Sequence, residues 1–241
     1  MNQRQLAIAA LAALCWARSS NARADLPGES YRNHLVLSLG VGVGSLSPTE
    51  YNGYVDGQNG VAAAGGQPLQ GSAAHASFEL HVPILATYYF PYYLLLRTGV
   101  EAAYFFPTEK LAGGDTVTNY GGTAEVPILL GAHYAFLDNR LIAELALGPA
   151  IAGFSSAGLN GTSGYTGVQL YSDVAVGLDD ELKGQFFITP GFSVGLEIGY
   201  RVLTSGPLHT SAGADVLVGG KPVHLDMSGF RGVFELGFVA F

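Results

Sequence analysis

Acidic and basic residues recur in this sequence at spacings that would make them neighbours on adjacent strands. If the chain reverses at tight turns centred on Pro91, Asp138-Asn139 and Pro190, residues equally far from each turn lie opposite one another. Four such pairs join a basic side chain to a carboxylate: His81–Glu101, His133–Glu144, Lys183–Glu197 and Asp179–Arg201. Buried charges must be paired, because unpaired ones destabilise a fold. We therefore expect these residues to form ion pairs inside the fold.

Further carboxylates on the same strand faces outnumber the bases that could neutralise them. These additional acids are Glu79, Glu125, Asp173 and Glu181. We expect some of them to pair with Arg97 and the others to be protonated or bound to water. An excess of acid along a continuous water path would favour cations.

His75 and Ser77 come closest to a catalytic pair. The segment His75-Ala76-Ser77 places an imidazole and a hydroxyl on one strand face. A serine triad also needs a carboxylate that orients the histidine, and no acid follows at a matching spacing. Parity along the strand directs both side chains inward. We therefore expect no catalytic residues, and the absence of metal-ligand spacings and phosphate-binding loops in the sequence predicts no metal or cofactor.

Alternation of apolar with small or polar residues is the main pattern of the chain and predicts half-buried strands. From Leu37 to Val43, for example, every second residue is leucine or valine and the residues between are serine or glycine. The pattern recurs in eight segments: 34–46, 75–90, 93–106, 123–137, 141–151, 168–188, 192–202 and 223–241. Asp180 interrupts the apolar face of the sixth segment, which suggests a bulge there. Phe238 and Phe241 differ in parity, so the register of the last segment stays open.

The connections between these segments are alternately short and long. The short ones are the three turns named above, and the long ones are Gly/Ser/Thr-rich: 47–74, 107–122, 155–166 and 204–222. Short turns at one end and long loops at the other are the plan of a transmembrane β-barrel. Binding function concentrates in loops on a rigid scaffold. We therefore expect the longest loop to be a contact surface, through Tyr51, Tyr54, Asp56 and Asn59.

The composition excludes several classes of protein. Of 241 residues, 49% are hydrophobic and 12% are charged, about half the charged fraction of ordinary soluble domains. No apolar run reaches the roughly 18–20 residues of a transmembrane helix. The formal net charge of −8 argues against a nucleic-acid partner, which basic side chains would have to neutralise. A soluble barrel would need many Lys and Glu on its outer face, whereas the polar faces here are mainly Gly, Ala and a few acids.

The beginning of the sequence predicts a cleaved signal peptide. Arg4 precedes the apolar stretch Leu6–Trp16, and Ala22-Arg23-Ala24 has the small-x-small pattern of a cleavage site. The segment holds the only cysteine, Cys15, so a mature chain that starts at Asp25 has no thiol. We expect three parts: a signal peptide (1–24), a short periplasmic segment (25–33) and a barrel domain (34–241).

The export signal, the eight alternating strands and the terminal Phe241 together resemble the small eight-stranded outer-membrane β-barrel proteins of Gram-negative bacteria. The resemblance implies an all-β, antiparallel, up-and-down transmembrane barrel with both termini in the periplasm. It implies a location in the cell outer membrane, with outer-membrane lipids and lipopolysaccharide as partners. During insertion the partner would be the barrel-assembly machinery, which reads the terminal aromatic residue.

Three functions stay open, because one fold hosts many activities. The first is a non-enzymatic barrel with a surface or structural role through its extracellular loops and a lumen largely filled by ion pairs. The second is a narrow channel for small solutes or apolar molecules. The third is a lipid A-modifying enzyme, since His75-Ala76-Ser77 resembles the His-x-Ser pair of outer-membrane lipid A deacylases. We favour the first, because an eight-stranded barrel has a lumen just wide enough for its own side chains.

Overall fold

The computed structural model describes residues 32–46, 48–64, 75–110, 116–161, 169–172 and 174–240. The expected signal peptide, Asp173 and Phe241 lie outside these residues. Within the described part of the chain, no helix is both long and apolar enough to cross a membrane.

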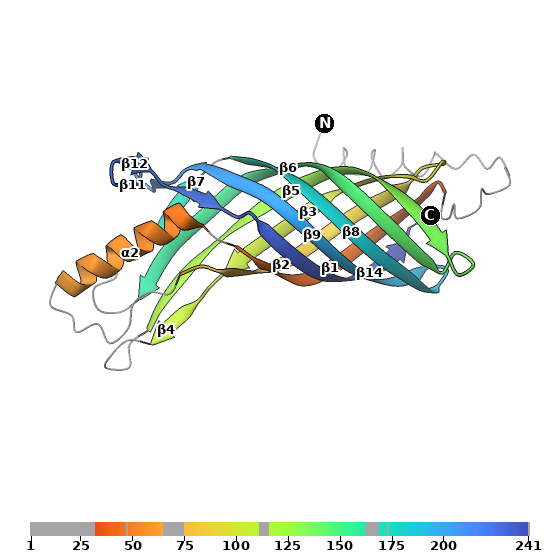
Figure 1. Cartoon of the computed structure of the whole chain (residues 1–241), viewed down its shortest axis with the longest axis horizontal. Helices are drawn as coiled ribbons and strands as arrows, with labels where there is room; N and C mark the ends of the chain where they lie inside the picture. Colours follow the sequence, from red (N-terminus) through yellow and green to blue (C-terminus); the bar gives the residue numbers. More distant parts are fainter. Residues whose placement is uncertain are drawn as a thin grey trace, which may run out of the picture.

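Eight strands form a closed antiparallel barrel (Figure 1). They are β1 (His34–Ser45), β2 (Phe78–Tyr89), β3 (Leu94–Phe105), β5 (Thr116–Phe136), β6 (Leu141–Gly161), β8 (Ala175–Thr189), β9 (Phe192–Pro207) and β14 (Gly229–Val239). Each pairs with the next in this series, and β14 pairs with β1. The ring has no free edge, since every barrel strand has a neighbour on both sides. The predicted eight-stranded antiparallel barrel is confirmed.

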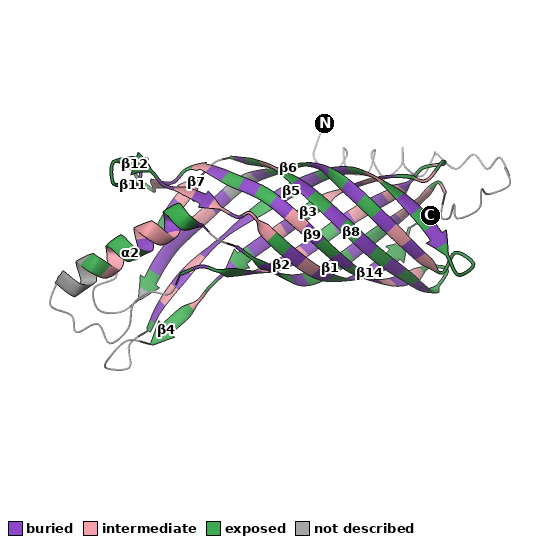
Figure 2. Ribbon diagram, viewed as in Figure 1, coloured by how far each residue is buried: buried purple, intermediate pink, exposed green. Residues whose placement is uncertain are grey.

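The strand pleat separates two kinds of side chain, seen in Figure 2 as alternating buried and exposed bands. On β1, Leu37, Leu39 and Val41 are 47–53% exposed, whereas Val36 and Ser38 between or beside them are buried. Successive side chains of a strand point to opposite faces, so one face of every strand lines the lumen. The outward face is the apolar one.

Short turns join β2 to β3, β5 to β6 and β8 to β9 at one end of the barrel, as predicted. In the second turn Asp138 and Asn139 have φ values of 54° and 66°, a left-handed conformation that Asp and Asn tolerate better than most residues. β1 begins and β14 ends at this same end, where Ala240 N donates a hydrogen bond to Leu35 O (2.8 Å).

The opposite end carries the long connections, and they hold more regular structure than the sequence analysis predicts. The additional elements are α2 (Thr49–Ala64), β4 (Thr108–Lys110), β7 (Gln169–Ser172), β10 (His209–Thr210), β11 (Leu217–Val218), β12 (Lys221–Pro222) and β13 (His224–Asp226). Much of 107–122 and 155–166 was predicted as loop but extends β5 and β6, which stay paired out to Val117 and Gly161. The prediction was wrong because Gly, Ser and Thr here are paired strand residues.

Two strand boundaries also differ from the predictions. The last barrel strand starts at Gly229, and its register against β1 and β9 is continuous. The bulge suggested at Asp180 is absent, because the β8–β9 register runs unbroken through it and shifts only between Phe187 and Thr189. Asp180 is an outward-facing residue of a regular strand.

The buried side chains of the described residues form two apolar clusters and a charged group. Near the short turns lies a small apolar cluster: Val36, Tyr89, Leu95, Leu129, Ile142, Ala146 and Phe187. A larger apolar cluster fills the end with the long connections, where Phe105, Val117 and Leu203 of the barrel pack with Tyr51 and Val55 of α2. Most of the buried charged side chains occupy the strand positions between these two clusters, whereas His133 and Glu144 lie level with the cluster near the short turns.

Candidate functional site

The central layer of the lumen gathers nearly all of the charged residues that the sequence analysis singles out. Every one of them that the structure describes is at most 2% exposed: Glu79, His81, Glu101, Glu125, His133, Glu144, Asp179, Glu181, Lys183, Glu197 and Arg201. They come from β2, β3, β5, β6, β8 and β9, at positions of one parity on each strand. Asp173, also expected there, lies outside the described residues.

The strand register places three of the four predicted pairs directly opposite each other. His133 faces Glu144, Lys183 faces Glu197 and Asp179 faces Arg201.

The fourth predicted pair is wrong, because Glu101 lies opposite Pro83 and His81 lies opposite Ala103. The first turn is centred on Tyr92 and not on Pro91, with both Tyr92 and Tyr93 at positive φ. That difference of one residue in the turn centre moves every cross-strand partner by two.

Side-chain contacts in this layer run across the lumen to partners other than those opposite in the register. Lys183 Nζ donates to Glu235 Oε2 on β14 (2.6 Å), although Glu197 is the residue opposite it. His81 also contacts a carboxylate other than the predicted one, but on its own strand: its Nε2 lies 2.7 Å from Glu79 Oε1. A lumen this narrow brings side chains of non-adjacent strands within reach of one another.

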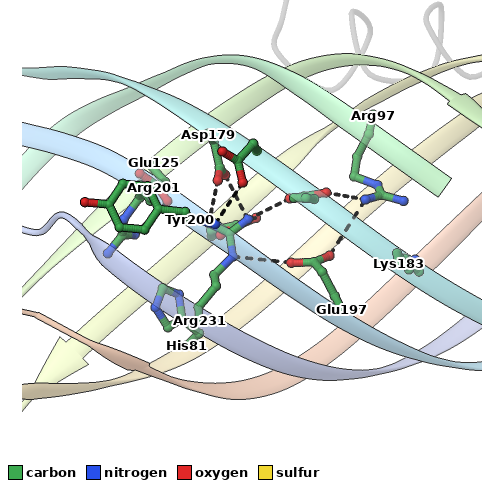
Figure 3. A network of polar contacts seen from close by, with 12 residues as sticks. His81, Arg97, Glu125, Asp179, Lys183, Glu197, Tyr200, Arg201 and Arg231 are labelled. Carbon is green, nitrogen blue, oxygen red and sulfur yellow. Dashed lines mark hydrogen bonds and ion pairs between the residues drawn. The ribbon is translucent and has the colours of Figure 1, made fainter.

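Arg231 is the centre of the network (Figure 3) and was missed by the sequence analysis. Its Nη1 and Nη2 donate to both carboxylate oxygens of Asp179 (2.7 and 2.8 Å), and Nη2 also donates to Glu181 Oε1 (2.7 Å). Its Nε donates to Glu197 Oε1 (3.3 Å), and Glu101 Oε1 is 3.8 Å from Nη2. One guanidinium therefore faces four carboxylates. The outward parity of Phe230 and its neighbours could have identified Arg231 and Glu235 as inward residues.

Arg97 and Arg201 occupy either side of this centre. Arg97 forms ion pairs with Glu144 and Glu181, and its Nε donates to Thr87 Oγ1 (3.0 Å). Arg201 Nη1 donates to Glu125 Oε1 (2.8 Å), and its Nη2 donates to both oxygens of Glu79 (2.8 and 2.9 Å). Fork-shaped guanidinium groups suit such shared recognition of carboxylates.

The described buried charges are not balanced. Eight carboxylates face three guanidinium groups and one ammonium, with two imidazoles beside them. Each guanidinium is therefore shared among several acids. A carboxylate can be buried without a large loss of stability only if it has such partners. The barrel can therefore bury these acids only when the ion-pair network forms.

Among the described residues, one group of acidic side chains has the spacing of a metal site, and an arginine lies within it. Carboxylate oxygens of Glu101, Asp179 and Glu181 lie within 4.8 Å of one another. Arg231 Nη2 lies among them, at 3.8, 2.8 and 2.7 Å. The guanidinium thus fills the position that a cation would take.

The long-loop residues do not form the expected contact surface as a group. Tyr51 is fully buried: its hydroxyl donates to Asn119 Oδ1 (2.8 Å) and Gly158 O (3.2 Å), and its ring lies 5.9 Å from that of Phe105. Its assignment as a contact residue is wrong, because this segment is a helix that packs into the barrel mouth. Tyr54 and Asn59 are partly buried, and Asp56 is exposed.

His75 and Ser77 are both exposed, so the inward orientation predicted for them is wrong. They precede the first residue of β2, where the strand parity does not yet apply. His75 Nε2 lies 2.8 Å from Asp56 Oδ1 of α2, a carboxylate that sequence spacing could not identify. Among the described residues, Ser77 contributes only its carbonyl, which accepts a hydrogen bond from Leu46 N (3.1 Å). The three residues do not form the hydrogen-bonded relay of a serine triad.

Comparison with known proteins found similarity in structure and no match in sequence. No protein-family model matches the chain, and no curated protein matches it in sequence. The chain is similar to Neisserial surface protein A (12% identity, TM-score 0.41, 85% of this chain and 96% of that one). It is similar to the outer membrane protein OprG of Pseudomonas aeruginosa (10% identity, TM-score 0.43, 90% and 97%). A third similar structure is the outer membrane protein AlkL in DMPC lipid bilayers (11% identity, TM-score 0.34, 92% and 94%).

Replacing the central guanidinium should destabilise the barrel strongly. Arg231→Met removes the ion-pair partner of Asp179 and one of the two arginines that contact Glu181 and Glu197, and we expect a loss of about 3–5 kcal/mol in the free energy of unfolding. The deficit should shrink as the pH falls, since protonated carboxyl groups need no guanidinium. Urea unfolding of the reconstituted protein measures both effects. Arg140→Met, in the exposed β5–β6 turn, is the control, and equal losses in the two variants would contradict the central role of Arg231.

The docking of α2 should weaken at alkaline pH. Burial raises the pKa of Tyr51 well above its ordinary value of 10.0, because a phenolate would lose its hydration there. Tyr51 ionises at a lower pH in the undocked state than in the docked state. Docking is therefore unaffected below about pH 10 and weakens above it. Cleavage of α2 by a protease, followed from about pH 8 to about pH 11, should rise in the native protein.

Tyr51→Phe separates this effect from general alkaline unfolding. The variant should lose about 1 kcal/mol of docking free energy at neutral pH with its hydroxyl hydrogen bonds, and its cleavage should show no alkaline rise. Tyr92→Phe, exposed in a turn at the other end, should behave as the native protein. An alkaline rise that persists in Tyr51→Phe would rule out Tyr51 as its cause.

Proposed function

We propose that this chain is a non-enzymatic outer-membrane β-barrel with a closed lumen and a structural or surface role through its loop end. The observation that carries the proposal is the arrangement of the two apolar clusters and the charged group inside the barrel. Apolar clusters occupy both ends of the lumen, and a shared ion-pair network occupies the middle. Side chains in such an arrangement join the strands to one another and exclude a wide water path.

The outward face supports the placement in a membrane. Apolar side chains there are extensively exposed, among them Leu196 (69%), Leu130 (67%) and Val176 (64%). A soluble protein rarely exposes a continuous apolar surface of this extent, whereas a transmembrane barrel needs an apolar band about 25 Å tall.

Aromatic residues border the band on both sides. At the turn end Tyr134 packs on Phe136 (centroids 4.8 Å apart), and Phe192 packs on Phe238 (5.2 Å). At the other end Tyr200 packs on Phe230 (4.7 Å). Aromatic girdles of this kind lie at the two lipid–water interfaces of membrane barrels.

The two ends of the barrel support an orientation. Short turns are periplasmic in outer-membrane barrels, and the longer connections face outward. The proposed orientation puts both chain termini in the periplasm and α2 at the cell surface. The cleaved signal peptide, the assembly signal at Phe241 and contact with lipopolysaccharide belong to the same proposal.

In the part of the chain that the structure describes, helix α2 packs against the barrel at the outer end, which favours a surface role over a channel. α2 is attached at several points: Asn52 exchanges two hydrogen bonds with the backbone of Ala76 (3.0 and 3.1 Å), and Glu50 accepts one from His224 N (3.0 Å). Asp56 remains exposed on this helix, beside His75. A helix held by these contacts can bind a partner at a smaller ordering cost than a flexible loop.

A charge placed in the middle of the outward band tests the membrane placement. Leu196 lies midway on β9 between Phe192 and Tyr200 of the two girdles. Leu196→Arg should reduce the free energy of unfolding in lipid vesicles by about 2–4 kcal/mol, the cost of arginine at a bilayer midplane. Leu217→Arg, equally apolar and 56% exposed in the β11–β12 hairpin, should change it by less than about 0.5 kcal/mol. Equal effects of the two substitutions would refute the placement.

Single-channel recording tests the closed lumen. We expect the purified, inserted barrel to give no reproducible conductance steps in a planar bilayer, because the ion-pair layer and both apolar clusters block the lumen. Protection of the barrel from added protease in vesicles establishes that it has inserted. Reproducible steps from inserted protein would overturn the closed lumen and favour the narrow channel.

A further inference from the structure

One charged residue stands on the outward face of the barrel. Among the described residues of the eight barrel strands, Asp180 is the only Asp, Glu, Lys or Arg that points outward. Its neighbours along β8 are Leu178 and Leu182, which are 58% and 51% exposed. Its cross-strand neighbours are Leu147 on β6 and Tyr200 on β9. A carboxylate in such apolar surroundings is costly unless it has a partner.

The carboxylate is held in place but not neutralised by the chain. Its Oδ1 accepts a hydrogen bond from the backbone N–H of Tyr200 (3.1 Å). The four basic side chains of the central layer are buried on the other side of the barrel wall. No cation among the described residues forms an ion pair with Asp180. Its negative charge is therefore available to a partner outside the barrel.

Two aromatic rings lie beside this carboxylate. Tyr200 is directly opposite Asp180 in the register, and Phe230 is directly opposite Tyr200 on the next strand. The two rings are 4.7 Å apart at an angle of 59°, and Phe230 is 70% exposed. A carboxylate next to aromatic rings suits an ammonium group, which both attract. The pair belongs to the loop-side girdle, so an occupant would lie at headgroup depth.

An apolar groove begins at this group and continues across the neighbouring strands. It has a volume of about 740 Å³ and is lined by Asp180, Tyr200 and Phe230 together with leucines of β5, β6 and β8. Gly131 and Gly199 line it as well. A groove of this kind accommodates hydrocarbon chains, while the outward-facing carboxylate of Asp180 selects the head of the molecule.

We propose that Asp180, Tyr200, Phe230 and the adjoining groove bind a membrane lipid whose head carries an ammonium group. The hydrocarbon chains lie in the groove, and the ammonium group lies between the carboxylate and the two rings. The carboxylate of Asp180 favours this lipid class, because it attracts an ammonium group and repels an anionic head. The inference rests on the proposed function, since it requires the outward face to meet lipid.

Spin-labelled lipids test the site in phosphatidylglycerol vesicles that contain the inserted barrel. We expect the motionally restricted fraction of chain-labelled phosphatidylethanolamine to exceed that of chain-labelled phosphatidylglycerol, with an association ratio of about two to five, the range of an exposed cation–ring contact. Asp180→Asn should abolish this preference, while the asparagine oxygen can still accept the Tyr200 N–H. Phe230→Leu should reduce it.

Asp138→Asn is the matched control, because it removes the same charge from an exposed turn at the other end of the barrel. It should leave the preference unchanged. The proposal is wrong if the native protein and Asp180→Asn restrict both lipids equally. It is also wrong if phosphatidylglycerol becomes the preferred lipid on addition of Ca²⁺, since a metal-bridged phosphate would then be the occupant. Protease protection in the same vesicles distinguishes failure of the lipid site from failure of the proposed function. A barrel that inserts but shows no lipid selectivity overturns only the lipid site. A barrel that does not insert overturns the proposed function as well.

Discussion

The desolvation of carboxylates inside a narrow barrel is the constraint on which this structure depends. Eight buried acids share three guanidinium groups and one ammonium, and a carboxylate that loses both water and its cation destabilises the fold by several kcal/mol. This cost is reduced because each guanidinium contacts several carboxylates. Arg231, Arg97 and Arg201 each reach carboxylates of two or more strands, so a small number of cations neutralises a larger number of acids.

The barrel wall follows from the same constraint. Charges can be collected in the lumen only if one face of every strand points inward, and the pleat provides this alternation. The opposite face must then carry the apolar residues, which gives the chain its high hydrophobic fraction without a long apolar run. Asp180 is the exception on the outward face, and its hydrogen bond to the Tyr200 backbone keeps it there without disturbing the register.

Much of the fold could be predicted from the sequence, because period-two alternation depends only on local side-chain types. The eight strands, the three short turns and the burial of the predicted lumen residues follow from it. The partners of those residues could not be predicted, since they lie across the lumen and not on the adjacent strand. Lys183 illustrates the difference, with Glu197 opposite in the register and Glu235 as its contact. Helix α2 was missed because a Gly-containing segment such as Gly53–Gly60 has low helix propensity, and its docking against Phe105 and Asn119 is a tertiary effect.

The sequence separation of the ion-pair partners has a consequence for how the barrel assembles. Arg201 and Glu79 are 122 residues apart, Arg97 and Glu181 are 84 apart, and Lys183 and Glu235 are 52 apart. Contacts between such distant residues pay a loop-closure entropy before they contribute stability, which slows folding. Because the arginines of β3, β9 and β14 hold acids of other strands, the polar layer is completed only when the last strand meets the first. Partly assembled sheets must keep these acids hydrated, so we expect water to leave the lumen as the ring closes.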